Sequence, residues 1–232
     1  MPPVSPTILG YVLYWPIFDP IVFQIWLKVF VDPVKWTPAK EGWFKIGSPT
    51  VEPEPGKKLI TPSGKKYDSL KADDIVFVSL EGRYDEKGLQ PSSEWRFHKD
   101  IYLKKADAKA VVHAHSPHAT AVSAHNKDIP AFHYMIALAG GDNIKCAKYA
   151  TFGTQELSDN IIEALENRKA CLMSNHGQVA YGDNLNSAFE LAEEVENICH
   201  QYINAIKLGE PKILSSSEMD VILEKVKNYK KG

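Results

Sequence analysis

Two short apolar runs that each lead into histidines constrain the fold of this chain most strongly. Residues 109–115 are Lys-Ala-Val-Val-His-Ala-His, and residues 170–177 are Ala-Cys-Leu-Met-Ser-Asn-His-Gly. Apolar runs of this length predict short buried β-strands. Residues i and i+2 of a strand face the same side, so His113 and His115 should project together. Gly177 predicts a tight turn beside His176.

The three histidines at these two strand ends predict a site for one divalent transition metal. Three imidazoles would leave a coordination position open, which is typical of catalytic rather than structural metal sites. A lone histidine more often makes hydrogen bonds in a protein core, and that interpretation stays open for each of the three. The His-x-His pair together with a distant His-Gly pair nevertheless favours metal binding.

The rest of the chain mixes strand and helix patterns, which predicts an α/β or α+β fold with no internal repeat. Runs of β-branched and other apolar residues predict strands, and apolar residues three or four apart predict helices. The expected strands are 59–61, 75–80, 108–115, 129–133, 170–174 and 179–182. The expected helices are 94–104, 117–125, 134–139, 158–167, 185–208 and 217–229.

Composition limits the classes of partner and the compartment. The formal net charge of the 232 residues is −2, so no broad positive surface for nucleic acid is expected. The three cysteines are too few and too widely spaced for a disulfide framework or a thiolate metal site. A reducing, cytoplasmic setting therefore fits best. The cysteines are Cys146, Cys171 and Cys199.

The N-terminal segment, residues 1–46, differs in character from the remainder, 47–232. Its apolar stretch from Ile8 to Val31 contains Pro16, Asp19 and Lys28, so it does not predict a membrane span. It also lacks the basic start and cleavage site of a signal peptide. We expect short helices or strands that pack on the body of the protein; an interaction arm is the alternative.

Glu94 is the best candidate for an acid or base beside the histidines. Ser92-Ser93-Glu94 has the pattern of a helix start, where serine caps free amides and a carboxylate is favoured. A carboxylate oxygen can bind zinc, and it can also leave the metal and accept a proton. The alternative is a helix-start charge with no other role.

Several ordered blocks of sequence together resemble the class II aldolase/adducin superfamily, and within it most closely the L-fuculose-phosphate aldolases. The resemblance covers residues 59–229. It implies a single-domain α/β fold with a central, mostly antiparallel sheet flanked by helices. The blocks are Pro-Ser-Ser-Glu-Trp-Arg-Phe-His at 91–98, Val-His-Ala-His at 112–115, Ile-Pro-Ala-Phe-His-Tyr-Met-Ile at 129–136, Tyr-Ala-Thr-Phe-Gly-Thr at 149–154 and Asn-His-Gly at 175–177.

The resemblance implies that His113, His115, His176 and Glu94 surround one catalytic zinc ion per chain. It also implies reversible cleavage of L-fuculose 1-phosphate, a phosphorylated ketose, into dihydroxyacetone phosphate and L-lactaldehyde. Tyr134 matches a tyrosine that reaches a neighbouring subunit's site and protonates the aldehyde oxygen, so a homotetramer with sites at subunit interfaces is implied.

Further residues match the substrate contacts of the same family. Phe152 matches an aldehyde-pocket residue, and Tyr229 matches a C-terminal tyrosine that closes the site. Ser48 stands where the family has an asparagine at the phosphate end. The phosphate-binding positions match Ser63, Gly64, Ser92 and Ser93, for which ordinary turn and capping roles are the alternative. Rival functions are an epimerase or dehydratase on the same scaffold, or a non-catalytic adducin-like interaction module.

Overall fold

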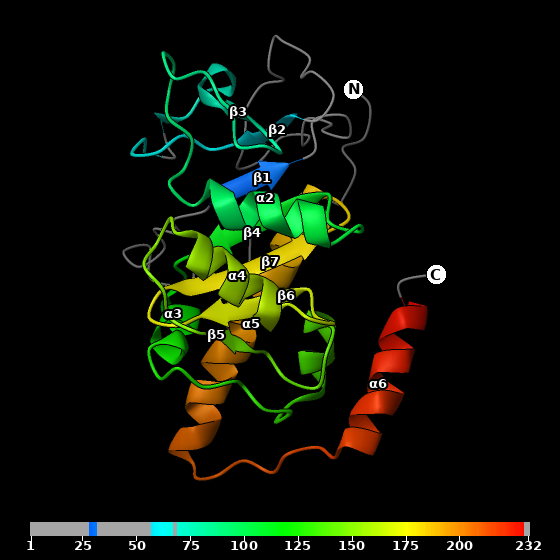
Figure 1. The fold of residues 1–232 in the computed structure, drawn as a ribbon. Coiled ribbons are helices and arrows are strands. Elements are labelled where there is room, and N and C mark those ends of the chain that lie inside the picture. Colours follow the sequence, from blue (N-terminus) through cyan, green and yellow to red (C-terminus); the bar gives the residue numbers. More distant parts are fainter. Residues whose placement is uncertain (1–27, 32–56, 67–68, 230–232) are drawn as a thin grey trace, which may run out of the picture.

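The structure, a computed structural model, describes residues 28–31, 57–66 and 69–229 (Figure 1). Within these residues, seven strands form one sheet in the order β3-β2-β1-β4-β7-β6-β5. Neighbouring strands are antiparallel except β5 and β6, which run parallel. The strands are β1 (Lys28–Val31), β2 (Lys57–Ile60), β3 (Val76–Ser79), β4 (Ala110–Ala114), β5 (Cys146–Ala147), β6 (Ala170–Met173) and β7 (Gly177–Gly182).

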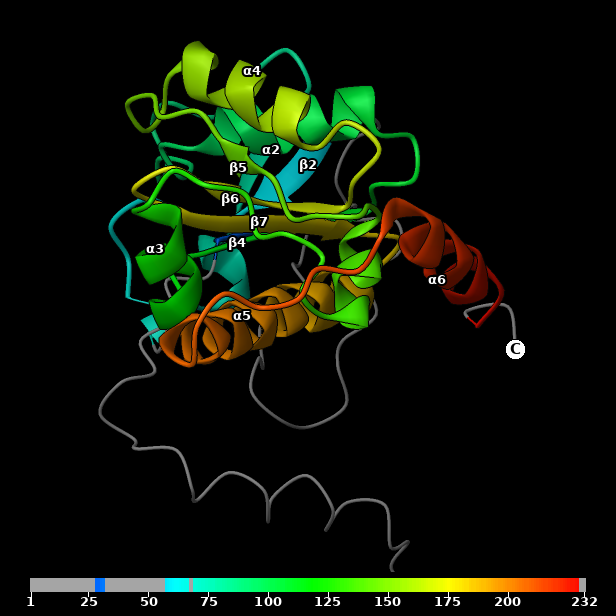
Figure 2. The same ribbon diagram turned by 90° about the horizontal axis from the view of Figure 1, so that it is seen from below.

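Helices cover both faces of this sheet and make a three-layer α/β fold, which confirms the predicted architecture (Figure 2). Helices α2 and α4 lie on one face, and α3 and α5 lie on the other. The α-helices are α2 (Trp95–Lys104), α3 (Pro117–Ser123), α4 (Gln155–Ala164), α5 (Leu185–Lys207) and α6 (Ser216–Tyr229). Two 3-10 helices are η3 (Ala72–Asp74) and η4 (Tyr134–Ala139).

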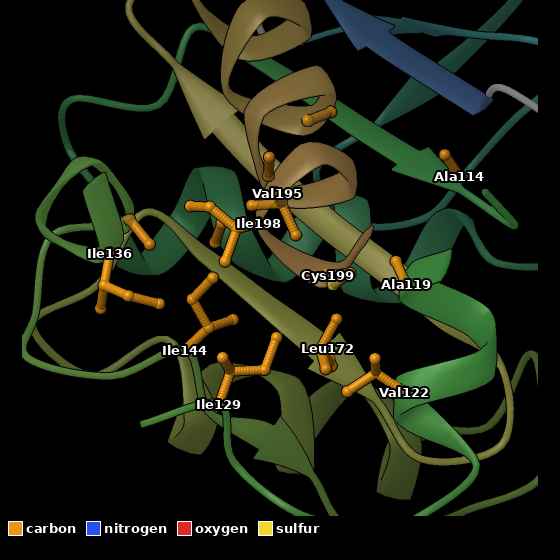
Figure 3. Close-up of a cluster of buried hydrophobic side chains, with 14 of the residues drawn as sticks. Ala114, Ala119, Val122, Ile129, Ile136, Ile144, Leu172, Val195, Ile198 and Cys199 are labelled. Carbon is orange, nitrogen blue, oxygen red and sulfur yellow. The ribbon is translucent and has the colours of Figure 1, made fainter. Parts of the chain in front are cut away.

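Side chains along β4 point alternately to the two faces of the sheet, and this alternation sets the direction of the His113 imidazole. Val112 belongs to the apolar cluster beneath α3 and α5, part of which is drawn in Figure 3, whereas Val111 belongs to the cluster beneath α2 and α4. His113 lies two residues after Val111, so its imidazole faces α2. Phe97 of α2 contacts that imidazole edge-on, with ring centroids 5.5 Å apart.

The prediction of a strand at residues 129–133 is wrong. In this described segment, Ile129 makes only an isolated bridge with Ile144, through backbone hydrogen bonds of 2.9 and 3.0 Å. Pro130 has no N–H with which to extend the ladder. The chain then enters η4, which is a 3-10 helix and ends as predicted at Gly140, whose φ is 98°.

Helix α4 begins earlier than the predicted Ser158. Thr154 is its N-cap, and the Thr154 hydroxyl oxygen accepts a hydrogen bond from the Leu157 amide at 3.2 Å. Ser158 therefore lies inside the helix, where its hydroxyl donates to Asp100 of α2 at 2.6 Å. A buried serine that joins two helices has the same sequence signal as a capping serine, which explains the error.

Strand β1 comes from the N-terminal segment and lies inside the sheet. Its Phe30 pairs with Ile60 of β2, and its Val29 pairs with Val112 of β4. The other residues of 1–46 lie outside the described residues, so the division into 1–46 and 47–232 stays a prediction. No helix in the described part of the chain is long and apolar enough to cross a membrane.

Candidate metal centre and active site

Four side chains from three separate segments converge at one end of the central strands. Glu94, His113, His115 and His176 each offer a ligand atom, and these atoms all lie within 4.8 Å of one another. The Nε2 atoms of His113 and His115 are 3.0 Å apart. The imidazole centroids of the three histidines are 4.7–4.9 Å apart. The structure thus brings together the four residues that the sequence predicts as metal ligands.

A backbone carbonyl fixes the orientation of His113. Its Nδ1 lies 2.8 Å from the carbonyl oxygen of Gln178, which can only accept a hydrogen bond. Nδ1 therefore carries a proton, which leaves Nε2 as the nitrogen of His113 that can bind a metal at the centre. The Gln178 side chain is itself held by hydrogen bonds to Ser116 at 2.8 Å and to the Ala192 carbonyl at 3.0 Å. Sequence reasoning did not find Gln178, because its role depends on the β4–β7 register.

A close approach of two strands places His176. Asn175 adopts a left-handed conformation with φ 56°, and the His176 amide bonds the Met173 carbonyl at 3.0 Å. A Cβ at Gly177 would overlap the carbonyl oxygen of Ala114. Glycine is therefore required by this close approach, at the first residue of β7, whereas the sequence predicts it for a tight turn. It lets His176 reach the end of β4 beside His115.

Glu94 turns its carboxylate toward the histidines and not toward the helix amides. It is the N-cap of α2, but its side chain makes no capping hydrogen bond. Its Oε2 lies 3.2 Å from Nε2 of His113, and its Oε1 lies 3.1 Å from Nε2 of His176. The residue is 1% exposed. A buried carboxylate needs such partners, because burial of an unpaired charge is strongly unfavourable.

The prediction that serine side chains cap α2 is wrong in one respect. The hydroxyl oxygen of Ser92 accepts a hydrogen bond from the amide of Glu94 at 3.3 Å, one position before the helix. The carbonyl oxygen of Ser92 accepts from the Trp95 amide at 3.0 Å. Ser92 therefore shapes the turn that presents Glu94.

This donor set fits a divalent transition metal. The Nε2 atoms of His113 and His115 are 3.0 Å apart, a separation that needs either a proton or a cation between them. Tetrahedral coordination by imidazoles with bonds of about 2.0–2.1 Å places neighbouring nitrogens about 3.3 Å apart. Neutral imidazoles and a carboxylate suit zinc and several other divalent ions of the first transition row.

The two predicted phosphate-binding segments lie side by side next to this centre. The Ser63 amide bonds the Gln90 carbonyl at 2.8 Å, and the Ser92 amide bonds the Thr61 carbonyl at 3.0 Å. Ser63, Gly64 and Ser93 are exposed, whereas Ser92 is buried. Gly64 has a φ of 71°. Three of the four predicted positions thus form an accessible surface beside the turn that carries Glu94.

Comparison with known proteins decides the family. Residues 39–203 match the family described as class II aldolase and adducin N-terminal domain. The chain belongs to this family. An L-fuculose phosphate aldolase from Escherichia coli is 51% identical over 172 residues, which cover 74% of this chain and 80% of that protein. A 5-methylthioribulose-1-phosphate/5-deoxyribulose-1-phosphate aldolase from Rhodospirillum rubrum is 48% identical over 171 residues, which cover 74% and 77%.

A solved L-fuculose 1-phosphate aldolase structure has the same fold. It superimposes with a TM-score of 0.74 at 37% sequence identity, and the match covers 87% of this chain and 85% of that one. The protein is therefore a class II aldolase, a lyase whose family uses a divalent metal. The cluster of Glu94 with three histidines is able to bind that metal.

Two residues that the resemblance assigns to substrate contacts are exposed in this class II aldolase. Tyr134 is 55% exposed and opens η4, whose Ile136 lies across the core cluster from Ala114 at the end of β4 (Figure 3). Phe152 is 65% exposed. Tyr229 is the last residue of α6, and its side chain lies outside the described residues, as does all of Ser48.

Proposed function

We propose that the protein is a zinc-dependent aldolase that reversibly cleaves L-fuculose 1-phosphate into dihydroxyacetone phosphate and L-lactaldehyde. The observation that carries this proposal is the buried Glu94 carboxylate, which faces His113 and His176 at 3.2 and 3.1 Å. A carboxylate in this place can serve as a ligand and, once displaced by substrate, as a base. Zinc, when bound, supplies a Lewis acid that draws charge from the ketone oxygen.

In the condensation direction, Glu94 is proposed to remove a proton from the hydroxymethyl carbon of dihydroxyacetone phosphate. The electron pair of that C–H bond becomes the enediolate, which attacks the aldehyde carbon and forms the new C–C bond. The hydroxyl of Tyr134 gives its proton to the aldehyde oxygen. Glu94 then loses a proton to water and Tyr134 regains one, so both residues return to their starting states.

Phosphate recognition is proposed to use the paired turns at residues 61–64 and 90–93. Ser63, Gly64 and Ser93 are accessible there, and they precede or flank the N-terminus of α2, where anions are favoured. Ser92 is proposed to act mainly through its hydrogen bond to the Glu94 amide. Ser48 is proposed to replace the family's asparagine at the same end of the substrate.

We further propose a homotetramer in which Tyr134 completes a neighbouring subunit's site. Its ring is exposed, as a residue that acts in another subunit requires. Ile136 of the same 3-10 helix lies across the core cluster from Ala114 at the end of β4 (Figure 3). Tyr229 is proposed to close the site from the end of α6, and Phe152 is proposed to form the aldehyde wall. The three cysteines are free thiols, which supports a reducing compartment such as the cytoplasm.

A second candidate substrate is a 5-deoxy or 5-methylthio derivative of ribulose 1-phosphate. It is favoured by the Rhodospirillum rubrum relative and by a 5-deoxy-D-ribulose 1-phosphate aldolase from Bacillus thuringiensis, which is 40% identical over 176 residues. Cleavage of any of these ketose phosphates between C3 and C4 releases dihydroxyacetone phosphate. The candidates therefore differ only in the aldehyde half.

Condensation assays with one ketone and several aldehydes test the proposal. Dihydroxyacetone phosphate would be incubated with L-lactaldehyde, acetaldehyde or methylthioacetaldehyde, and kcat/KM would be compared. The highest value for L-lactaldehyde supports the fuculose assignment, and a higher value for either other aldehyde supports the pentulose derivatives. If no aldehyde is consumed while another ketose phosphate is epimerised or dehydrated, the aldolase proposal is refuted. Metal analysis should find about one zinc per chain.

A further inference from the structure

The loop that carries Phe152 is hydrogen-bonded to the first turn of helix α2. Nη1 of Arg96 donates a hydrogen bond to the carbonyl oxygen of Gly153 at 2.6 Å, although the two residues are far apart in sequence. The Arg96 guanidinium also lies over the ring of Trp95, with 4.8 Å between its central carbon and the ring centroid. Stacking on the ring restricts the rotamers of the guanidinium and so aims its hydrogen bond.

Gly153 brings this loop into backbone contact with the phosphate side of the site. Its φ is 76°, and a Cβ at this position would lie 2.9 Å from the carbonyl oxygen of Ser93. Inside the loop, the amide and the hydroxyl of Thr154 both bond the Thr151 carbonyl, at 3.3 and 2.7 Å. The loop is therefore a closed turn, and Arg96 and the glycine contact together set its distance from α2.

We propose that Arg96 is a positioning residue that sets the aldehyde selectivity of the enzyme. It holds the Phe152 loop at a fixed distance from the turn that presents Glu94, two residues earlier in the chain. This inference rests on the proposed function, in which Glu94 acts at the ketone carbon and Phe152 borders the aldehyde. One long-range hydrogen bond then links the two halves of the site, and misplacement by about 1 Å would have a large effect on the second substrate.

The proposal separates the two half-reactions of the condensation. Proton removal from dihydroxyacetone phosphate needs the metal ligands, Glu94 and the phosphate turns, but it needs no aldehyde. Without aldehyde, the enediolate takes a proton back from solvent, so deuterium from D2O enters the hydroxymethyl carbon. Carbon–carbon bond formation additionally needs the aldehyde wall. A residue that positions only Phe152 should affect the second step and leave the exchange unchanged.

The test compares Arg96→Met with the wild-type enzyme in both half-reactions. Methionine keeps an apolar stem over Trp95 but has no donor for the Gly153 carbonyl. We expect deuterium exchange and zinc content within about twofold of wild type, and an aldehyde KM raised about tenfold, as loss of a charge-assisted hydrogen bond predicts. The ratio of kcat/KM for L-lactaldehyde over acetaldehyde should fall toward one. Arg96→Lys, which can still donate one hydrogen bond, should recover part of that ratio.

Gly153→Ala provides an independent perturbation of the same contact. Its methyl group would push the loop away from the Ser93 carbonyl, so it should reproduce the Arg96→Met profile despite unlike chemistry. The matched control is Lys99→Met, which removes the other cation over the Trp95 ring, 5.5 Å from its centroid. Lys99 makes no hydrogen bond to the described loop at 151–154, so this variant should behave as wild type in both half-reactions.

Three results would overturn the inference. Loss of exchange in Arg96→Met in proportion to the loss of condensation would place Arg96 on the phosphate or metal side. An unchanged aldehyde KM and selectivity in Arg96→Met would show that the hydrogen bond to Gly153 does not position the aldehyde wall. Equal losses of condensation activity in Lys99→Met would show that the effect does not come from the hydrogen bond to Gly153. Failure of the wild-type enzyme to exchange deuterium would instead refute the proposed function itself, so the two failures are distinguishable.

Discussion

Replacing Glu94 with glutamine should remove proton transfer and leave the metal centre assembled. Glutamine has nearly the same shape, so its amide can occupy the place between His113 and His176, which lie 3.2 and 3.1 Å from the carboxylate. It cannot accept the substrate proton at neutral pH. Loss of a positioned general base lowers rates by about 10²–10⁴-fold, which adds about 3–5 kcal/mol to the activation barrier.

The decisive assay for Glu94→Gln is deuterium exchange into dihydroxyacetone phosphate, measured beside zinc content. Exchange and cleavage should fall together by the factor above, while the zinc content per chain stays near that of wild type. Glu163→Gln is the matched control, because that glutamate is exposed and contacts Lys148 on the surface at 3.2 Å. Full exchange activity in Glu94→Gln would refute the assignment of Glu94 as the base.

Three further predictions address the subunit arrangement, the metal and pH. We expect Tyr134→Phe subunits and Glu94→Gln subunits to be inactive alone but to recover activity when the two are denatured and refolded together. In random hybrids, about a quarter of the sites combine an intact Glu94 with the intact Tyr134 of a neighbouring subunit. No recovery would contradict sites that are shared between subunits. Chelation should abolish activity and lower Tm by several degrees, since the ion binds the folded chain, and zinc should restore both. Burial of Asp100 opposes its ionisation and raises its pKa. Hydrogen bonds from Ser158, Gln155 and Lys99 together outweigh burial, so the pKa of Asp100 lies below its usual value. Asp100→Asn should therefore lower the free energy of unfolding by about 1 kcal/mol at neutral pH. That difference should begin to shrink as pH falls below 3.8, the ordinary value for aspartate, and should be lost once pH falls through the lower folded pKa; urea titrations at several pH values from 7 down to about 2 test this, and a difference independent of pH would contradict it.

The grouping of the three histidines proposed as metal ligands could be predicted because their placement follows from local rules. A strand turns residues i and i+2 to one side, which pairs His113 with His115. A glycine after His176 predicts the turn that brings it to the neighbouring strand. The direction of the Glu94 side chain could not be obtained in this way. Whether a carboxylate at a helix start caps the amides or faces a buried centre depends on what lies opposite it, and here the partners are His113 of β4 and His176, which is distant in the sequence.

Contacts between segments that are distant in sequence could not be predicted from the sequence for the same reason. The Gln178 carbonyl orients His113 only because β7 pairs with β4 in one particular register. Gly153 and Arg96 give no individual signal, since glycine in a turn and arginine on a helix are both common. The strand predicted at 129–133 was wrong because neighbouring strands were needed to show that no partner ladder is available beyond Ile129.

The proposed metal ligands lie on strand ends and a helix N-cap, whereas the proposed aldehyde wall lies on a loop. This arrangement explains how closely similar enzymes can act on different ketose phosphates. Relatives at 51% and 48% identity bear names with different sugars, yet any such substrate yields dihydroxyacetone phosphate when C3–C4 is cleaved. In this chain the residues proposed to serve the common half lie at strand ends and at the N-cap of α2, and His113 and Glu94 among them are fully or almost fully buried. The part of the site proposed to bind the aldehyde is bordered by the exposed Phe152, on a loop to which Arg96 donates a hydrogen bond. Surface loops tolerate change with little loss of stability, whereas buried ligands do not. Substrate choice should therefore respond to substitutions in residues 149–154 that leave deuterium exchange intact, and the aldehyde comparison, more than overall identity, should distinguish fuculose from pentulose phosphates.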